Sequence, residues 1–397
     1  MALSTGTVSP ASTRARNAVL ATFFLNGFAF ATWASRIPSV RHDLDLHPAS
    51  LGLLLLSCSI GSVLALPTSG GSVQRFGARR VVVVATMVEG VGLVLVAVGA
   101  GGLAALPVTA LGLFLVGLGT GTWDVAMNVE GAEVERRLNR SIMPRFHAAF
   151  SLGTVAGAGI GALVTYAGVG VLWHVALVGV LVAALGNVSV RGFLAVDPQA
   201  PAPEQTATRS ALKAWLEART VLIGLMVLAM ALTEGVANDW LGVAMVDGYG
   251  APAWLGAAAF ALFVASMTAG RVAGPVVLDT YGRAAVLWSS MAVAVLGVLL
   301  VVLGSLPALV CVGIVLWGLG ASLGFPVGMS AAADDPARAP ARVSVVSTIG
   351  YTAFLGGPPL LGFIGSHVGV LHALLVVSIL LVPSALAVPA ARKPGAA

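Results

Sequence analysis

Long apolar runs separated by short polar segments dominate the sequence between residues 17 and 390. A helix needs about 20 apolar residues to cross the hydrocarbon core of a membrane, and each run is about that long. The runs therefore predict twelve transmembrane helices, six on either side of a longer polar interruption. The first six are expected at 17–35, 50–70, 81–101, 106–128, 146–168 and 169–190. The second six are expected at 220–240, 252–272, 284–304, 306–329, 343–366 and 369–390.

The interruption at 191–219 has the composition of a linker. It contains a Pro-rich polar stretch at 197–204, and residues 211–217 are expected to form a short amphipathic surface helix. We therefore divide the chain into five parts: an N-terminal segment 1–16, a six-helix bundle 17–190, the linker 191–219, a second six-helix bundle 220–390 and a C-terminal segment 391–397.

Composition agrees with a membrane protein. Of the 397 residues, 58% are hydrophobic and 9% are charged, whereas a soluble domain carries about 25% charged residues. This balance excludes a soluble fold, and the expected spans leave no room for a large soluble domain. Cys58 and Cys311 both lie in apolar runs, so they predict neither a disulfide framework nor a metal site. We expect no cofactor.

The basic residues predict the orientation in the membrane. Lys and Arg near span ends resist translocation and gather on the cytoplasmic side. If both termini are cytoplasmic, 19 of the 21 Lys and Arg residues fall on that side, and only Arg36 and Arg41 fall outside. The chain is therefore expected to be a multi-pass protein of the cytoplasmic (inner) membrane. The basic residues on the cytoplasmic side, next to the lipid bilayer, then account for the formal charge of +5, so we expect no nucleic acid partner.

An internal repeat supports the division into halves. Gly77 follows the second expected span, Gly282 follows the eighth, and the two lie in similar polar segments 205 residues apart. The same offset relates the fifth and eleventh spans through two matches: 146–148 with 351–353, and Gly157 with Gly362. The chain therefore reads as two six-helix halves in parallel register.

The two polar segments resemble the signature of the major facilitator superfamily between its second and third spans. That signature reads Gly, three residues, Asp, Arg, one residue, Gly, one residue, then Arg or Lys. Both copies keep most of its positions: Gly70, Arg75, Gly77 and Arg79 in the first, and Asp279, Gly282 and Arg283 in the second. Gln74 replaces the acid in the first copy, and Pro275 replaces the leading glycine in the second.

This resemblance covers nearly the whole chain and implies an all-α polytopic membrane protein of the superfamily's fold, with 12 transmembrane helices in two pseudo-symmetric six-helix bundles. It also implies alternating access, in which the bundles rock about a midplane site and the loop motif stabilises one closed state. The motif residues are therefore gating candidates: Arg75, Gly77, Arg79, Asp279, Gly282 and Arg283. The alternative is that the arginines merely enforce the topology.

Three further segments look like the MosC and YbjJ branch of the superfamily, which is linked to uptake of rhizopine-type cyclitols. They are 32–38, 123–128, and Phe146-His147 followed by 151–153. The branch resemblance implies a small polar solute.

Four acidic residues lie within expected spans, where a charge is costly and usually functional: Glu89, Asp124, Glu234 and Asp239. Glu234 lies in the seventh span with Asn238 on the same helical face, and no cation is expected beside it. A carboxyl buried in this way favours its neutral form and can exchange a proton when access switches. Glu234 is therefore the first candidate for proton coupling. Asp239 and Glu89 are the next candidates, with helix packing as the alternative for Glu89. Asp239 and Trp240 are expected near the outer interface, where Trp240 either anchors the helix in an aromatic belt or forms a gate.

Two residues are expected near the cytoplasmic ends of spans. Asp124 should lie close to the loop that carries Arg75 and Arg79, so we expect a gate salt bridge there. Direct substrate contact and an interfacial position without function remain alternatives for Asp124. His147, in the first turn of the fifth span, is expected either to pack helices or to belong to the cytoplasmic gate.

The candidates for substrate binding are polar or aromatic residues of the spans: Asn26, Trp33, Asn128, Asn238 and Tyr351. Asn26 is expected about 13 Å into the first span, near the midplane. Its amide both donates and accepts hydrogen bonds, which suits a ligand with hydroxyl groups. Trp33 can stack on an apolar ring face or anchor the helix at the interface.

These observations predict a secondary active transporter for a small polar solute, sugar- or cyclitol-like, coupled to protons. The first alternative is a multidrug or metabolite exporter of the same fold; the fifth span is glycine-rich, as in drug exporters, but lacks their proline. A sensor that does not transport is a further alternative. The sequence offers no nucleophile with a paired base and no phosphate loop, so we do not expect an enzyme. The expected partners are the solute, protons and the bilayer, and the protein is expected to be monomeric.

Overall fold

The computed structural model describes residues 10–138, 142–194, 213–335 and 338–392, and within these ranges the chain forms helices and no strand. Ten helices there are long and apolar enough to cross a membrane, judged by length and composition. The expected all-α polytopic membrane class is therefore confirmed, whereas the count of twelve crossings stays a prediction. The Pro-rich stretch 197–204 and the two chain ends lie outside the described residues. Of the short helix expected at 211–217, residues 211 and 212 also lie outside them, and residues 213–215 are helical.

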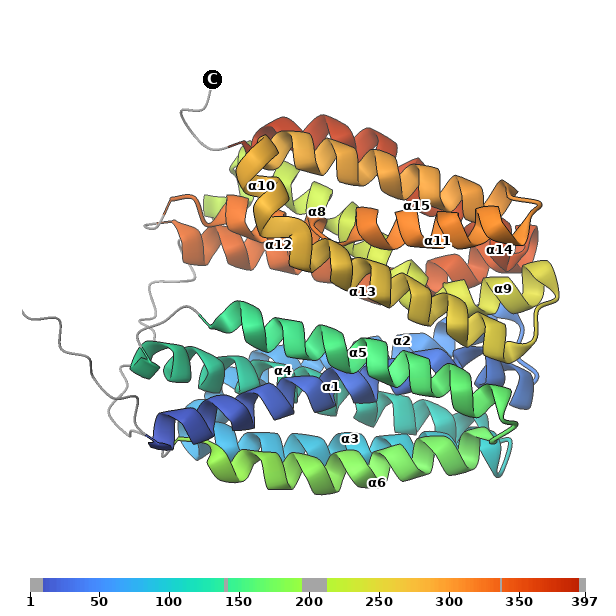
Figure 1. The fold of residues 1–397 in the computed structure, drawn as a ribbon, viewed down its shortest axis with the longest axis horizontal. Coiled ribbons are helices and arrows are strands. Elements are labelled where there is room, and N and C mark those ends of the chain that lie inside the picture. Colours follow the sequence, from blue (N-terminus) through green and yellow to red (C-terminus); the bar gives the residue numbers. More distant parts are fainter. Residues whose placement is uncertain (1–9, 139–141, 195–212, 336–337, 393–397) are drawn as a thin grey trace, which may run out of the picture. The chain divides into compact units, whose positions relative to one another are not determined.

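The first six expected spans each fall on one helix: α1 (Pro10–Asp43), α2 (Pro48–Phe76), α3 (Ala78–Gly101), α4 (Leu106–Leu138), α5 (Met143–Tyr166) and α6 (Val171–Ser189). The short η1 (Val190–Gly192) follows α6. Figure 1 shows α3 and α6 side by side along their lengths. Their outward positions, such as Val84, Val91 and Leu177, are exposed apolar side chains, as expected of helices that face lipid.

The second half is less regular. Its helices are α8 (Ala218–Val236), η2 (Ala237–Leu241), α9 (Gly242–Tyr249), α10 (Ala253–Leu303), α11 (Pro307–Ala321), α12 (Gly324–Ala332), α13 (Ala339–Val368), α14 (Val370–Ala373), α15 (Leu375–Ser384) and η3 (Ala385–Ala391). The 51 residues of α10 cover the expected eighth and ninth spans. Gly282, which has non-helical backbone angles, separates the two. The two arms of α10 run in opposite directions on either side of this glycine (Figure 1).

The two motif glycines share one backbone conformation. Gly77, between α2 and α3, has φ 81°, and Gly282 has φ 75°. Residues other than glycine rarely adopt such backbone angles, so glycine allows the chain to reverse within one residue at both places. The sequence repeat is therefore also a repeat of the backbone.

Close helix contacts repeat in the same way. A Cβ added at Gly92 of α3 would lie 2.7 Å from the carbonyl oxygen of Gly112 in α4. A Cβ added at Gly297 of α10 would likewise lie 2.7 Å from the carbonyl oxygen of Gly313 in α11. The first members of these pairs are 205 residues apart and the second members 201, so the chain between the two contacting glycines is four residues shorter in the second half. Small residues allow both helix pairs to approach until their backbones touch.

Two helices of the second half are interrupted where their counterparts in the first half are continuous. Between α8 and α9, η2 is a π-helical turn, which places one extra residue in the helical path. Between α11 and α12, the helix stops at Ala321 and restarts at Gly324. Irregular backbone inside a membrane helix is tolerated where it is buried in protein or lines a cavity, so both places are candidates for a site.

By compactness the chain forms two units, Met1–Trp33 with Ser57–Ile160 and Gly168–Ala202, and Ala34–Leu56 with Gly161–Ala167 and Pro203–Ala397. The second unit thus includes one end of α1, α2 and α5. Within it, a Cβ added at Gly52 would lie 2.5 Å from the carbonyl oxygen of Pro358, which shows how closely α2 packs on α13. The bundles 17–190 and 220–390 remain a prediction based on the sequence repeat.

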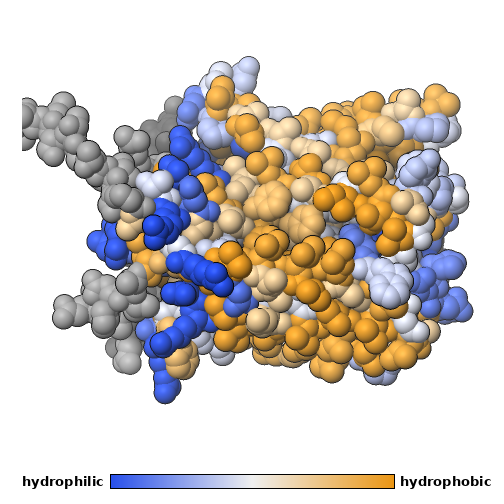
Figure 2. All heavy atoms as spheres, turned by 60° about the horizontal axis from the view of Figure 1, so that its bottom comes forward, coloured by the Kyte–Doolittle hydropathy of each residue, from blue (hydrophilic) through white to orange (hydrophobic). Residues whose placement is uncertain are grey.

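Apolar side chains cover the middle lengths of the helices on the face shown in Figure 2, and hydrophilic residues gather near the helix ends. This distribution is that of a protein whose helices lie in a bilayer.

Candidate functional site

An ion pair lies inside the second unit, at the centre of its helices. Arg271 Nη2 of α10 donates to Glu234 Oε2 of α8 at 2.9 Å. The side chains are 29% and 20% exposed, respectively, so neither is fully enclosed by protein. Glu234 is the seventeenth of the 32 residues in the candidate span Ala218–Tyr249. The pair therefore joins opposite charges midway along a span.

This pair corrects two expectations from the sequence. Glu234 was expected to have no cation beside it, and Arg271 was counted with the loop arginines. The eighth span looked complete at residue 272, but α10 continues to the turn at Gly282, which leaves Arg271 about 16 Å inside the helix. No local pattern in α8 indicates its partner, because the contact joins residues 37 positions apart.

The backbone break in the next helix completes the site. Arg271 Nε donates to the carbonyl oxygen of Ser322 at 3.4 Å, between α11 and α12. A carbonyl freed by such a break needs another donor when it lies in a membrane segment. Arg271 therefore connects three segments of the second unit: α8, α10 and the break at Ser322.

The π-helical turn next to this site carries Asn238, Asp239 and Trp240. The side-chain oxygen of Asn238 and the indole nitrogen of Trp240 are buried, and neither has a hydrogen-bond partner among the described residues. Trp240 is fully buried, which excludes the aromatic-belt position considered for it from the sequence. Buried polar atoms without partners mark this turn as a place where a ligand or water can bind.

In the first unit, Asn26 and Trp33 of α1 are both buried. The amide nitrogen of Asn26 has no hydrogen-bond partner within the described ranges. An unmet donor near the middle of a membrane helix is consistent with the substrate-contact hypothesis for Asn26.

Glu89 is fully buried between α3 and α4. Its polar neighbour is the hydroxyl of Thr120, and a Cβ added at Gly119 would lie 2.7 Å from the Cβ of Glu89. Both carboxylate oxygens are shielded from solvent. This position favours the helix-packing alternative over proton exchange.

Asp124 lies deeper in its helix than the sequence indicated. The expected span ended at Asn128, but α4 continues to Leu138, so Asp124 lies about 21 Å before the end of the helix. Its carboxylate Oδ1 accepts a hydrogen bond from Asn128 Nδ2 at 3.2 Å. Among the described residues no ion pair joins Asp124 to Arg75 or Arg79. The extra residues of α4 include three glutamates and two arginines, and Glu133 there pairs with arginines of its own helix.

The motif arginines of the two halves have different partners. In the first half, the guanidinium of Arg75 lies 5.3 Å from the ring centre of Phe76. In the second half, Arg283 donates to Asp334 Oδ1 at 2.7 Å and to the hydroxyl of Ser330 at 2.8 Å. Arg219 also donates to Asp334, at 2.8 Å, so this acid holds two cations.

Asp334 was not among the residues expected to function. Burial by itself raises the pKa of its carboxyl, but hydrogen bonds and charges from Arg283 and Arg219 outweigh burial and hold the pKa below its ordinary value. The sequence signal was the pair of acids at 334 and 335, between the tenth and eleventh spans, in a region otherwise rich in arginine.

A second ion network ties the start of α8 to the start of α13. Glu217 accepts hydrogen bonds from Arg342 at 2.6 Å and from Arg338 at 3.4 Å. The hydrogen bond from Arg342 is the main reason that the pKa of Glu217 lies below its ordinary value. In the sequence, Arg338 and Arg342 were counted only as topology signals, yet both form specific contacts with Glu217.

His147 and Tyr351 lie in matching segments of the repeat, in which Phe146 corresponds to Tyr351 and His147 to Thr352, and both contact aromatic rings. The ring of His147 packs edge-on against Phe23 with centres 5.2 Å apart. The ring of Tyr351 lies 6.1 Å from Phe325 and 6.3 Å from Phe354. Both side chains therefore help to pack α5 and α13 against their neighbours.

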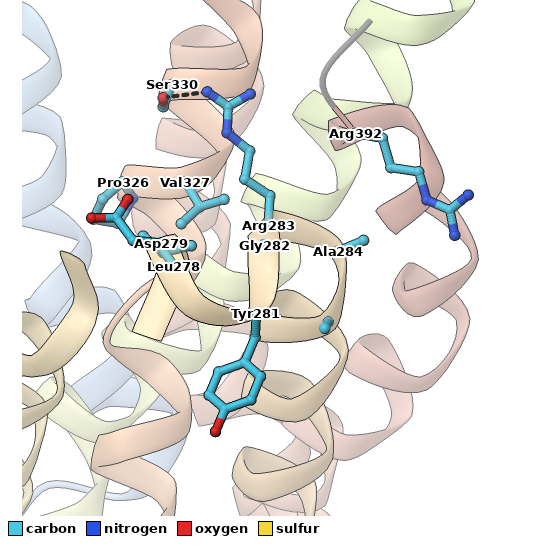
Figure 3. A pocket seen from close by; sticks show the side chains of 11 residues that line it. Leu278, Asp279, Tyr281, Gly282, Arg283, Ala284, Pro326, Val327, Ser330 and Arg392 are labelled. Carbon is cyan, nitrogen blue, oxygen red and sulfur yellow. Dashed lines mark hydrogen bonds between the residues drawn. The ribbon is translucent and has the colours of Figure 1, made fainter. Parts of the chain in front are cut away.

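A cavity of about 650 Å³ surrounds the turn at Gly282. Figure 3 shows Asp279 and Arg392 on opposite sides of Arg283, whose guanidinium contacts Ser330. The polar side chains of this cavity therefore do not converge on one point. We assign these residues to the ion network of the turn and not to a solute site.

An all-helical membrane protein with repeated halves, broken helices and a charged pair midway along its spans is a secondary transporter by class. The particular family follows from the sequence: the chain belongs to the Major Facilitator Superfamily, which it matches over residues 19–303. The resemblance seen in the loop motif is thereby confirmed.

Relatives support this assignment over most of the chain. An uncharacterized transporter of Sinorhizobium fredii is 34% identical, with 87% of this chain and 90% of that protein covered. An uncharacterized MFS-type transporter of Yersinia pestis is 31% identical, covering 86% of each chain. The membrane protein MosC of Rhizobium meliloti is 27% identical, covering 91% of this chain and 86% of MosC. The MosC resemblance inferred from short segments therefore extends along the chain.

Solved structures show the same fold. The nucleoside transporter NupG superposes with a TM-score of 0.76 at 15% identity, covering 96% of this chain and 99% of that one. A bacterial homologue of the human lysosomal transporter Spinster gives a TM-score of 0.74 at 11% identity, covering 97% and 98%.

Proposed function

We propose that this protein couples protons to the movement of a small polar, sugar- or cyclitol-like solute across the cytoplasmic membrane by alternating access. In this proposal both termini face the cytoplasm, and one chain is the transporting unit. The observation that carries the proposal is the Glu234–Arg271 pair, which lies midway along a span with both side chains partly exposed.

A carboxylate in this position can serve as the proton carrier. Its charge is balanced by Arg271 while it is ionised, and water reaches it for proton exchange. Glu234 is therefore our first assignment for coupling. Asp239, in the adjacent π-helical turn, is the second, and the fully enclosed Glu89 is the third.

The amides support a solute with hydroxyl groups. Asn26 has an unmet donor and Asn238 an unmet acceptor among the described residues. Hydroxyl groups can satisfy both, since each hydroxyl donates one hydrogen bond and accepts others. Trp33, Asn128 and Tyr351 remain further candidates for contact with the solute.

Gating is assigned to the loop motifs and their partners. Arg283, with Asp279 and Gly282 in its turn, fastens the end of α12 through Asp334. Arg75, Gly77, Arg79, Asp124 and His147 are the corresponding candidates in the first half. In our proposal Asp124 pairs with an arginine of its loop in another state of the transport cycle.

Export by proton antiport is the alternative. Its sequence support was the glycine-rich face of α5, but Gly153 and Gly157 are explained by packing: a Cβ at Gly157 would lie 2.5 Å from the carbonyl oxygen of Phe28 in α1. Close approach of α1 and α5 accounts for these glycines without an exporter motif.

Reconstituted vesicles test the proposal. Purified protein would be given labelled myo-inositol or glucose, with or without an inwardly directed proton gradient. We expect accumulation of a solute only with the gradient, and Glu234→Gln should abolish accumulation while it preserves exchange at equal pH. Glu133→Gln is the matched control, because Glu133 pairs with Arg136 and Arg137 on its own helix. Equal accumulation by the Glu234 variant would reject Glu234 as the coupling residue.

A further inference from the structure

Within the Glu234–Arg271 pair, Arg271 makes more hydrogen bonds than Glu234 does. Glu234 Oε2 is held by Arg271, and the Arg271 guanidinium is additionally held by the carbonyl of Ser322. A guanidinium carries five N–H donors, so these two contacts leave most of them available to an acceptor. Arg271 thus has one backbone acceptor, the carbonyl of Ser322, and one side-chain acceptor, Glu234. Of the two, Glu234 is the acceptor that another carboxylate can replace.

Charge balance determines what can replace Glu234. If Glu234 takes up a proton while Arg271 stays ionised, the guanidinium is left inside the membrane segment without a counter-charge. A charge left without a partner in a membrane segment is unfavourable, because nothing nearby compensates it. A neutral solute does not supply the missing charge, and an anionic group does.

We propose that the transported solute carries one negative charge, as a polyhydroxylated carboxylate, and that its carboxylate takes the place of Glu234 on Arg271. This inference rests on the proposed function, and it narrows the solute from polar to anionic. Bidentate binding of a carboxylate is the geometry for which the planar guanidinium is suited. A hydroxyl group of the solute then donates to the buried side-chain oxygen of Asn238, in the same unit as Arg271.

The proton is accounted for at each step. The solute carboxylate pairs with Arg271, and Glu234 takes one proton from water on the side to which the site is open. After access switches, the solute leaves as the anion, Glu234 releases its proton, and the Glu234–Arg271 pair forms again. One proton and one negative charge cross together, so the transport step is electroneutral.

Other charged or titratable groups near this pair are few. The elements packed against α8 include α11, α13 and η2. Their titratable or charged residues within the described ranges are Asp239 in η2, Cys311 in α11, and Arg342, Tyr351 and His367 in α13. On α10 itself, the remaining such groups lie near the turn at Gly282: Asp279, Tyr281 and Arg283. Asp239 is the acid nearest to Glu234 along the chain, so it is tested as the rival.

Matched pairs of probes test the inference by thermal stabilisation of the purified protein. Quinate and myo-inositol are ring polyols with and without a carboxylate, and glucuronate and glucose form a second such pair. We expect stabilisation by at least one acid and much weaker stabilisation by its neutral counterpart. The affinity for the acid should rise about tenfold for each unit by which the pH falls, because one proton is taken up per anion bound.

Variants of the pair give opposite results if the inference is correct. Glu234→Gln removes the competing carboxylate, so it should bind the acid more tightly than the wild type at pH 8 and lose the pH dependence. Arg271→Gln should lose acid binding, and Arg271→Lys should retain part of it; size-exclusion chromatography would show that both are folded. Glu133→Gln, the matched control on α4, should behave as the wild type. Asp239→Asn tests the rival acid of the adjacent turn. Retained pH dependence in Glu234→Gln, or its loss in Asp239→Asn, would overturn the inference.

Failure of this inference differs from failure of the proposed function. Binding and accumulation of myo-inositol or glucose, without binding of either acid, would overturn the anionic solute and leave proton-coupled transport of a polar solute intact. If none of the four probes binds and none accumulates under a proton gradient, both the inference and the proposed solute class are contradicted.

Discussion

The guanidinium of Arg41, in the last turn of α1, donates to the carboxylate of Asp247 in α9. This ion pair joins residues 206 positions apart, one from each half of the sequence repeat. Within the second unit, the α2–α13 contact between Gly52 and Pro358 lies in the same set of segments. The pair therefore fastens together parts of the two halves that alternating access would have to separate.

We expect Asp247→Asn to loosen this connection. Loss of the carboxylate leaves Arg41 with a weaker, neutral acceptor, and the equilibrium should shift towards states in which α1 and α9 are apart. Labelling of a single cysteine at Ala49, in the first turn of α2, by an impermeant reagent should become several-fold faster. The control is Asp45→Asn, an exposed acid in the α1–α2 connection, which should leave the rate unchanged. An equal rate in wild type and Asp247→Asn would remove the pair from the gate.

The predicted topology can be tested with two exposed leucines. Leu216 precedes α8 and is 87% exposed, and Leu103 lies between α3 and α4. In a background without Cys58 and Cys311, a cysteine at Leu216 should be protected from an impermeant reagent in intact cells. A cysteine at Leu103 should react in the same cells. The reverse pattern would place the termini outside the cytoplasm.

Asp334 should contribute to stability in a pH-dependent way. Its pKa is lower in the folded protein than the ordinary value of 3.8, so its contribution is fully present above that value and is lost as the pH falls through the folded pKa. At pH 7, Asp334→Asn should reduce stability by about 1–2 kcal/mol, because Arg283 and Arg219 lose a charged acceptor. The difference in melting temperature from wild type should shrink in acid. Asp335→Asn, at the more exposed neighbouring acid, should have a smaller effect at pH 7.

The gate assignment of Asp124 has its own test. If Asp124 pairs with a loop arginine in one state of the cycle, Asp124→Asn should destabilise that state and increase labelling of a cysteine at Ala148 of α5. In the structure Asp124 is bonded to Asn128, so folding should be little affected. Glu133→Gln serves as the control acid on the same helix. Unchanged labelling in Asp124→Asn would leave Asp124 as a residue that stabilises only its own helix.

The sequence predicted features that depend on neighbouring residues in the chain. Membrane helices appear as apolar runs because burial in lipid requires continuous apolar length, and the turns at Gly77 and Gly282 appear because only glycine suits their φ angles. Helix ends were less accurate, since polar residues such as Glu133 continue α4 beyond its apolar part.

The partners of charged residues could not be predicted in the same way. Arg271 and Asp334 each act through a side chain that reaches another helix, and no spacing along the chain encodes that contact. The π-helical turn at Ala237–Leu241 also lacks a local signal, because a single extra residue in a helix leaves the apolar pattern almost unchanged. Its buried polar atoms become visible only when the surrounding helices are in place.

The glycine contacts of the two halves have a mechanical consequence. At Gly92 and Gly112, and again at Gly297 and Gly313, backbone rests on backbone, so each helix pair resists sliding regardless of its side chains. Compliance is then concentrated in the interrupted segments, η2 and the break at Ser322, which occur in the second half of the chain. We therefore expect hydrogen exchange to be faster in these two segments than in the equivalent lengths of α1 and α4. The two halves of the repeat would thus differ in stiffness: the first half would move as a rigid body, and the second half would contain the segments that bend.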